Sequence, residues 1–239
     1  MLTRVKNALR QLIIRHYGVG STQIPSALQR LRINNFSPAH IFDVGAYTGE
    51  FAKTCRGIWP NAKLSCFEVL PHRVKELRAW SAMDGNTDVI ECLLGENVRS
   101  NVRFHEKETA SSILDDHISH SGPVEFYPMR TIDEVIATSN IRPPELLKLD
   151  VQGYEYEVLM GAKKALRDIE VILAEANLLD LYKGAHLLDD LIALLREHEF
   201  VAYDICEFHR RPLDAALWQA DFIFVPKDSQ LRKDKRWAV

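Results

Sequence analysis

The chain has 239 residues, of which 46% are hydrophobic, and its formal net charge is −3. This length can bury the core of one α/β domain with a small appendage, whereas two full domains would be cramped. No run of 18 apolar residues occurs, which excludes a membrane-spanning helix, and Arg10 and Arg15 interrupt the apolar N-terminus, which argues against secretion. The four cysteines lack Cys-x-x-Cys spacing, as is typical of free thiols in a reducing compartment, so we expect a cytoplasmic protein.

Charge is unevenly distributed along the chain. The first 42 residues contain six Lys or Arg and no acid, which leaves 24 basic and 33 acidic residues, a net charge of −9, for the rest. Within residues 1–36, apolar side chains recur at helical spacing from Leu2 to Ile13, which predicts a basic helical extension, and a second short helix follows at 25–33. The first helix packs on the domain, packs on a second copy in a homo-oligomer, or makes peripheral contact with an anionic membrane; these alternatives stay open. The acidic remainder argues against a nucleic acid partner.

A strand, a tight turn and a helix are predicted at residues 41–58. Apolar residues lead into Asp43, Gly45 and Gly49 interrupt the run, and a helix begins at Glu50. Elsewhere, strands are predicted at 63–67, 89–93, 146–149, 171–174, 201–205 and 221–225, and helices at 71–80, 131–137, 154–166 and 187–197. This alternation favours right-handed crossovers and a parallel sheet. The domain is expected to span 37–230, with 101–128 as an insertion or lid over the sheet edge and 231–239 as a basic tail.

The glycine spacing at the first turn selects the kind of cofactor. A dinucleotide fingerprint would need glycines at positions 47 and 50, and a phosphate-binding P-loop would need Gly-Lys at 50 and 51; neither is present. Acids at both ends suit a cofactor with cationic groups, and S-adenosylmethionine carries an ammonium and a sulfonium. We expect Glu68, at the end of the next strand, to accept hydrogen bonds from its ribose hydroxyls, with Val69 beside it among the cofactor-binding residues. The residues expected to hold the rest of the cofactor are Asp43, Gly45, Ala46, Tyr47, Thr48, Gly49 and Glu50.

Four acids come at the ends of predicted parallel strands: Asp43, Glu68, Asp150 and Glu175. Ligands bind outside the carboxyl ends of such strands, so these side chains are expected to point into one crevice. Methyl transfer to a hydroxyl requires in-line positioning and removal of the hydroxyl proton. Asp150 is our first candidate for that base, with Glu175 beside the acceptor. Lys148 either joins this chemistry or forms a structural ion pair with Glu155 or another neighbour.

Four segments resemble the FkbM-type S-adenosylmethionine-dependent methyltransferases. They are residues 41–51, the run Cys66-Phe67-Glu68-Val69-Leu70-Pro71, the run Thr131-Ile132-Asp133-Glu134, and residues 147–155 with Leu159 and Gly161-Ala162. The resemblance covers about residues 37–225. It implies a class I methyltransferase (Rossmann-like) three-layer α/β fold, whose seven-stranded, mostly parallel sheet has an antiparallel last strand, and O-methylation of sugars or other natural-product hydroxyls. The family usually has Glu where Gln152 stands, so we assign no proton transfer to position 152.

Other polar clusters allow weaker hypotheses. Asp115, Asp116, His117 and His120 are the densest group of metal-ligand types, but their polar surroundings predict a solvated lid, so we assign no metal ligand. Ser111 and Ser112 contact the substrate or cap a helical turn. His209, Arg210 and Arg211, in a loop with Trp218, contact an acidic substrate or are solvated.

The sequence thus predicts an S-adenosylmethionine-dependent O-methyltransferase. Its acceptor is expected to be a small molecule, with a sugar hydroxyl of a glycolipid, oligosaccharide or glycosylated metabolite as the leading expectation. The alternative is a non-catalytic protein that keeps the cofactor fold as a scaffold and docks to a membrane or partner through its basic N-terminal helix. An NAD-dependent oxidoreductase is disfavoured by the missing glycines.

Overall fold

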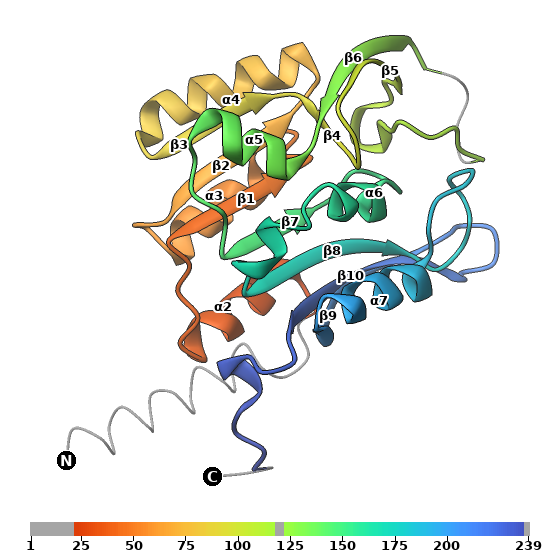
Figure 1. Ribbon diagram of the computed structural model, residues 1–239. Coiled ribbons are helices and arrows are strands. Elements are labelled where there is room, and N and C mark those ends of the chain that lie inside the picture. The colour runs from red at the N-terminus through yellow and green to blue at the C-terminus, as the bar shows by residue number, and fades with distance from the viewer. Residues whose placement is uncertain (1–21, 118–121, 237–239) are drawn as a thin grey trace.

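The computed structural model describes residues 22–117 and 122–236 (Figure 1). The predicted N-terminal amphipathic helix and His120 lie outside these ranges. The expectations of a homo-oligomer or of membrane contact through that helix therefore stay predictions. Within the described residues, no helix is both long enough and apolar enough to cross a membrane.

A seven-stranded sheet forms the centre of the domain, with the strand order β3-β2-β1-β7-β8-β10-β9. All neighbouring strands from β3 to β8 are parallel, whereas β10 runs antiparallel to both β8 and β9, as the sequence predicted. Its strands are β1 His40–Val44, β2 Lys63–Glu68, β3 Thr87–Glu91, β7 Leu146–Leu149, β8 Val171–Asn177, β9 Phe200–Arg210 and β10 Leu217–Pro226. The central strands are buried on both faces, which explains their nearly continuous apolar sequences.

Helices cover both faces of this sheet and produce three layers. Apolar side chains of α2, α3 and α4 pack on one face, and those of α5, α6 and α7 pack on the other. The helices are α2 Ile24–Ile33, α3 Glu50–Ile58, α4 Pro71–Asp84, α5 Ile132–Ser139, α6 Glu155–Met160 and α7 Leu188–Glu197, with 3-10 turns at Glu108–Ala110, Ala165–Arg167 and Gln230–Arg232. Along each strand, successive apolar side chains point to opposite faces of the sheet, so each strand contributes to both hydrophobic cores.

The structure has a second, three-stranded sheet of order β4-β6-β5, which begins before the predicted insertion at 101–128 and ends after it. Its strands are β4 Leu93–Leu94, β5 Arg99–His105 and β6 Val124–Arg130. Residues 106–117 follow β5 and are tied down by an isolated bridge between Asp116 and Tyr182. In Figure 1 this small sheet and the β9–β10 hairpin loop lie on the same side of the main sheet, toward which β8 runs.

Two predicted elements differ from the structure. The helix predicted at 154–166 ends at Met160, because Gly161 meets the backbone of Gly95 and the Asp133 carboxylate accepts the amides of Lys164 and Ala165 in a separate turn. The closing strands are longer than predicted, so His209, Arg210 and Trp218 belong to β9 and β10 rather than to a loop.

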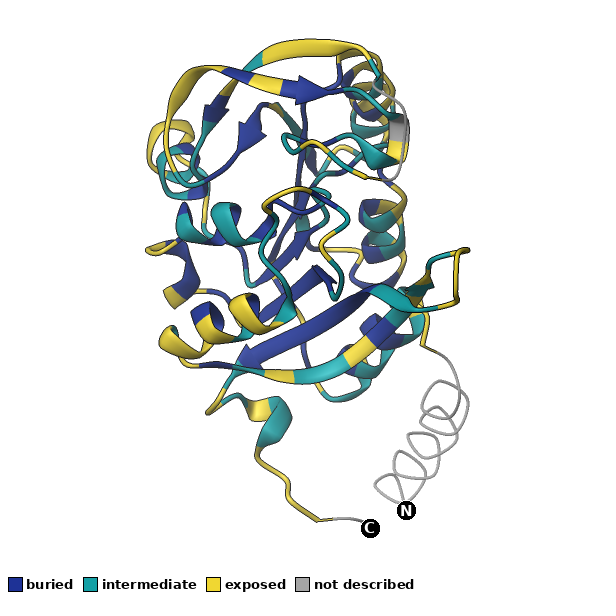
Figure 2. Cartoon of the chain, turned by 90° about the vertical axis from the view of Figure 1, so that its right-hand side faces the viewer, coloured by how far each residue is buried: buried dark blue, intermediate teal, exposed yellow. Residues whose placement is uncertain are grey.

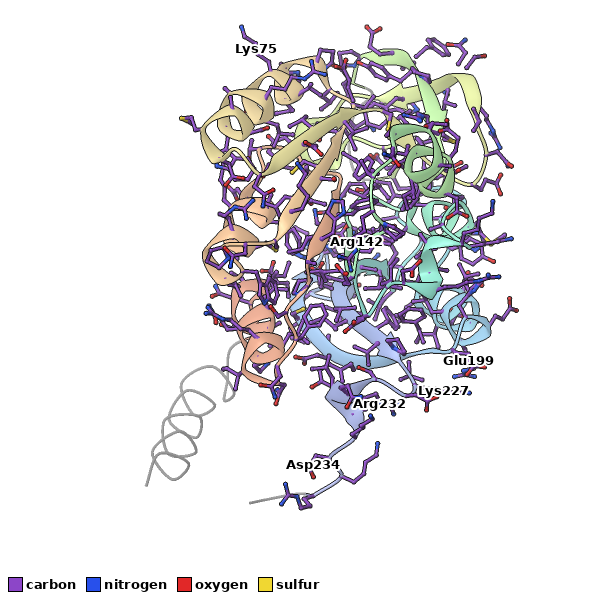
Figure 3. The ribbon with its side chains drawn as sticks, turned by 60° about the vertical axis from the view of Figure 1, so that its left-hand side comes forward. Lys75, Arg142, Glu199, Lys227, Arg232 and Asp234 are labelled. Carbon is purple, nitrogen blue, oxygen red and sulfur yellow. The ribbon has the colours of Figure 1, made fainter. Side chains whose placement is uncertain are left out.

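Charged side chains project from the outer surface of the molecule. Figure 3 shows Lys75 of α4 projecting outward at one end of the molecule and Glu199 and Lys227 lying together at the other. Glu199 and Lys227 form an ion pair where β9 begins and β10 ends. Exposed pairs of this kind contribute little to stability, so the layered cores hold the fold.

Candidate functional site

A cavity of about 480 Å³ opens at the carboxyl ends of β1, β2, β7 and β8. The end of β9, the start of β10 and residues 109–113 of the insertion complete its wall. Figure 2 views the molecule from the side toward which β8 runs, with the buried strands in dark blue. The volume lies within the range of small-molecule sites, and the position is the one at which open α/β sheets bind ligands.

The turn after β1 is shaped by close contact between two strand ends. Gly45 has a φ of +74°, and a Cβ there would lie 1.9 Å from the Asp150 carbonyl oxygen. The amides of Gly45 and Ala46 donate to the Phe67 carbonyl at 3.1 and 3.0 Å. Glycine at position 45 therefore lets the loops after β1 and β7 touch, which draws three strand ends together at one edge of the cavity.

Glu68 organises the cavity end near β2. Its carboxylate accepts the amides of Tyr47 at 2.8 Å, Val69 at 2.7 Å and Leu70 at 2.9 Å, and its side chain lines the cavity. A carboxylate offers about four lone-pair sites, so a ligand hydroxyl can still donate to it. The Tyr47 ring stacks under the Arg73 guanidinium, 4.1 Å from the ring centre, which fixes the wall beside Glu68.

Lys148 holds two carboxylates beneath the turn. Its Nζ lies 3.4 Å from Asp43 Oδ1 and 3.2 Å from Asp150 Oδ2, and it donates to the Gly45 carbonyl at 3.1 Å. Burial opposes its charge, but the carboxylates of Asp150 and Asp43 outweigh burial and raise the pKa of Lys148. Burial raises the pKa of Asp43, which is only 1% exposed. Lys148 thus pairs with its strand neighbours and not with Glu155.

Glu155 serves the loop after β7 instead. Its buried carboxylate accepts the Val151 amide at 2.9 Å and the Gly153 amide at 3.1 Å. Burial raises the pKa of Glu155 to about 7. The residue therefore fixes the loop that carries Gln152, whose φ is +55°.

A hydrogen-bonded network links the carboxylates at the other end of the cavity. Gln152 Nε2 donates to Asp150 Oδ1 at 2.9 Å and to Glu175 Oε2 at 2.8 Å, and the Tyr182 hydroxyl donates to Gln152 Oε1. Burial alone would raise the pKa of Asp150, but the Lys148 charge and the Gln152 hydrogen bond lower it. Burial, followed by the negative charge of Asp150, raises the pKa of Glu175 well above its usual range. The Lys148 charge and the Gln152 hydrogen bond therefore favour the ionised form of Asp150, whereas burial and the Asp150 charge favour the protonated form of Glu175.

The structure divides the residues singled out from the sequence into two groups. Those that line the cavity are Gly45, Tyr47, Glu68, Val69, Asp150 and Glu175. Those that do not line it are Asp43, Ala46, Thr48, Gly49, Glu50 and Lys148. Asp43 and Lys148 lie buried beneath the turn, and Gly49 and Glu50 begin α3. The residues that do not line the cavity can influence a ligand only by positioning the residues that do line it, or by changing the charge on them.

The described residues of the insertion roof the cavity, and two acids of the predicted cluster face basic side chains. Asp116 pairs with Lys107 at 2.9 Å, whereas Asp115 faces the His105 ring at 3.1 Å. Ser111 lines the cavity, and the Ser112 hydroxyl donates to the Gln152 carbonyl at 2.7 Å. The insertion is therefore fastened directly to the loop that carries the carboxylate network.

Several cavity residues were not singled out from the sequence. Apolar side chains of β4 and β5 form one wall, and Tyr182 and the β9–β10 hairpin form the opposite one. From the hairpin, Glu207, Gln219 and Asp221 line the cavity without having been singled out, whereas His209 and Trp218, which also line it, were named from the sequence as candidates for contact with an acidic substrate. Asp221 directly precedes the apolar run of β10, which is the one sequence signal that could have marked it.

Comparisons with known proteins agree with this geometry. The methyltransferase FkbM domain matches residues 43–202. The 2-O-methyltransferase NoeI of Sinorhizobium fredii is 26% identical over 179 residues, which cover 68% of this chain and 73% of NoeI. The hexuronic acid methyltransferase AglP of Haloferax volcanii is 26% identical over 170 residues, which cover 67% of this chain and 68% of AglP.

Solved structures show the same fold. Methyltransferase FkbM from Methylobacillus flagellatus matches with a TM-score of 0.51 at 17% identity, over 77% of this chain and 43% of that chain. Precorrin-6y C5,15-methyltransferase from Geobacter metallireducens matches with a TM-score of 0.50 at 13% identity, over 84% of this chain and 86% of that chain. Both likenesses confirm the predicted class I methyltransferase architecture. Because the FkbM domain matches more than half of its length, the chain belongs to the FkbM family and is a methyltransferase, as the sequence predicted.

Proposed function

We propose that this methyltransferase uses S-adenosylmethionine to methylate a hydroxyl group, with the acceptor a sugar in a glycolipid, oligosaccharide or glycosylated natural product. One observation carries the proposal: a single cavity joins the Glu68 carboxylate at one end to the Asp150, Gln152 and Glu175 network at the other. The description of AglP as a hexuronic acid methyltransferase and of NoeI as a 2-O-methyltransferase supports an acceptor of this class.

The residues near β2 fit the proposed cofactor. Glu68 is held by three backbone amides and keeps lone pairs toward the cavity for ribose hydroxyls. Val69, Leu93 and Phe104 provide an apolar wall suited to a purine ring. The cavity of about 480 Å³ is large enough for a nucleoside together with part of an acceptor.

The carboxylate network suits proton removal from a hydroxyl. When bound, the cofactor supplies a methyl group on a sulfonium sulfur, which departs as a thioether while the acceptor oxygen forms the new bond to carbon. Asp150, kept ionised by Lys148, accepts the hydroxyl proton. Burial and the Asp150 charge favour the protonated form of Glu175, and in that form its carboxyl group can donate a hydrogen bond to a second acceptor oxygen. Gln152 fixes the two carboxyl groups relative to each other, so most of the rate comes from positioning.

Cofactor binding is tested by calorimetry with S-adenosylhomocysteine. Glu68→Gln replaces one accepting oxygen by an amide that faces backbone donors, so we expect affinity to fall at least about tenfold. Glu91→Gln is the matched control, because Glu91 ends the neighbouring strand in register with Glu68 but is exposed and pairs with Arg78. Equal binding by both variants and the unmodified chain would contradict the assignment of Glu68.

The acceptor is tested by incubating the chain with methyl-labelled S-adenosylmethionine and an extract of glycolipids and saccharides. Mass spectrometry then identifies whichever molecule gains a methyl group. Asp150→Asn keeps the shape of the side chain but removes the proton acceptor, and we expect turnover to fall about 10² to 10⁴-fold. Transfer to a nitrogen or carbon atom, or undiminished transfer by Asp150→Asn, would refute the proposed chemistry.

A further inference from the structure

We propose that Glu207, His209 and Asp221 form a binding site for a divalent cation at the acceptor end of the cavity. One ligand atom from each residue lies within 4.8 Å of the other two, and all three residues line the cavity. Atoms that coordinate one small cation lie closer to one another than 4.8 Å. A modest rotation of these side chains would therefore bring their ligand atoms to coordinating distance. The site is separate from the Asp115 and Asp116 cluster of the insertion.

An irregularity in strand pairing brings these residues together. Asp221 pairs with Cys206, but the next residue back along β10, Ala220, pairs with Phe208, so β9 carries one extra residue, Glu207, with a φ of +44°. Before this bulge, Cys206 faces the core under α2 and α3; after it, His209 pairs with Gln219 and joins the sheet face of Asp221. Without the bulge, strand alternation would turn His209 to the opposite face.

Each carboxylate retains an oxygen for a ligand. Glu207 Oε1 accepts the Ile24 amide at 3.3 Å, which holds the side chain at the cavity wall and leaves Oε2 available. Asp221 is 5% exposed, and within the described part of the chain its carboxylate has no hydrogen-bond donor closer than the His209 ring, with 3.9 Å between His209 Nε2 and Asp221 Oδ2. A buried carboxylate with so loose a partner is costly unless a cation approaches it.

The local charge balance favours a cation. Asp221 lies opposite Glu175 in the register of β10 and β8. Gln152 donates hydrogen bonds to both Asp150 and Glu175, so three carboxyl groups lie close together here. The nearby Lys148 already contacts both Asp43 and Asp150. A divalent ion between Glu207, His209 and Asp221 supplies positive charge where carboxyl groups outnumber the basic side chains.

The ligand set indicates the kind of metal and its role. Two carboxylates and one imidazole suit Mn²⁺, and three protein ligands leave coordination positions open toward the cavity. Resting on the proposed function, this cation would hold a sugar acceptor through its hydroxyl oxygens beside Asp150. The protein part of the site does not depend on which acceptor is used.

The test measures Mn²⁺ binding to the full chain without cofactor or acceptor. Electron paramagnetic resonance of free Mn²⁺ and calorimetry should give one saturable site. Glu207→Gln, His209→Gln and Asp221→Asn should each weaken binding at least about tenfold. Asp214→Asn is the matched control, because Asp214 lies in the same hairpin but pairs with Arg211 at 2.6 Å and does not line the cavity.

Two results would overturn the proposal: no saturable Mn²⁺ binding at millimolar metal, or unchanged affinity in the Glu207→Gln and His209→Gln variants. Both of those side chains are only partly buried, so the variants should fold, as circular dichroism can verify. Asp221→Asn removes a buried charge and should leave the metal-free chain as stable as before, whereas a purely structural role predicts a lower melting temperature. Intact Mn²⁺ binding without methyl transfer would count against the proposed function alone.

Discussion

Replacing Lys148 by Met should destabilise the fold strongly at neutral pH. The Lys148 side chain is 7% exposed and lies between Asp43 and Asp150, at 3.4 and 3.2 Å. Removal of one member of a buried ion pair costs about 3–5 kcal/mol, because the remaining carboxylates lose their counter-charge. That cost is a large part of the roughly 5–15 kcal/mol that stabilises a typical domain. We expect the urea midpoint to fall by about 1 M or more.

The loss of stability in Lys148→Met should depend on pH, in a direction set by the shifted pKa values of Lys148 and Asp150. The pKa of Lys148 is raised, so its contribution is fully present below its unfolded pKa near 10.4 and is lost as pH rises through the folded value. The pKa of Asp150 is lowered, so its contribution is present above about pH 3.9 and is lost as pH falls through the folded value. In Lys148→Met the orphaned carboxyl groups take up protons, so the gap to the unmodified chain should narrow from pH 8 to pH 5.

A matched lysine supplies the control. Lys63 Nζ lies 2.8 Å from Asp88, closer than either Lys148 contact, but these side chains are 37% and 46% exposed. Lys63→Met should therefore change the free energy of unfolding by less than about 1 kcal/mol. Equal urea midpoints for Lys148→Met and the unmodified chain, or a gap that widens as the pH falls, would refute the reasoning.

Three further outcomes are expected. Gly45→Ala should lower the melting temperature, because its Cβ would lie 1.9 Å from the Asp150 carbonyl oxygen at a φ of +74°; Gly57→Ala, with no atom within 4 Å, should be neutral or stabilising in thermal unfolding. The pKa of Glu155 is raised to about 7, so this group lowers the stability of the fold as pH rises from about 4.5 through 7. Glu155→Gln should remove that pH-dependent loss, which is on the order of 3 kcal/mol in total, as denaturant titrations at several pH values can measure. Gln152→Glu should destabilise the chain more at pH 8 than at pH 5, since it replaces the amide that donates to Asp150 and Glu175.

The strand ends could be predicted because their signal is local. An apolar run that stops at an acid marks the ends of β1, β2 and β7, and the turn glycines at 45 and 49 mark the next helix start. The parallel order then places these ends at one edge of the sheet. The cavity position follows from those two rules without knowledge of any side-chain contact.

The distribution of charge within the site could not be predicted, because it depends on contacts between distant segments. Lys148 could pair with several acids in sequence, and its register beside Asp43 decided the outcome. The helix pattern over 154–166 ends at Met160, where a Cβ at Gly161 would lie 2.1 Å from the carbonyl oxygen of Gly95, which is far away in sequence. The bulge at Glu207 reverses the alternation of β9, and no apolar pattern in that exposed edge strand marks the reversal.

The position of β10 has a consequence for synthesis of the chain. Of the seven strands of the main sheet, β10 is the last to be synthesised, yet it lies between β8 and β9 and antiparallel to both. Until it emerges, β8 exposes an open, apolar edge, and the cavity lacks Asp221 and Gln219. Nascent chains therefore carry an unpaired β8 edge from the time β8 emerges until β10 emerges, which makes that stage vulnerable to misassociation.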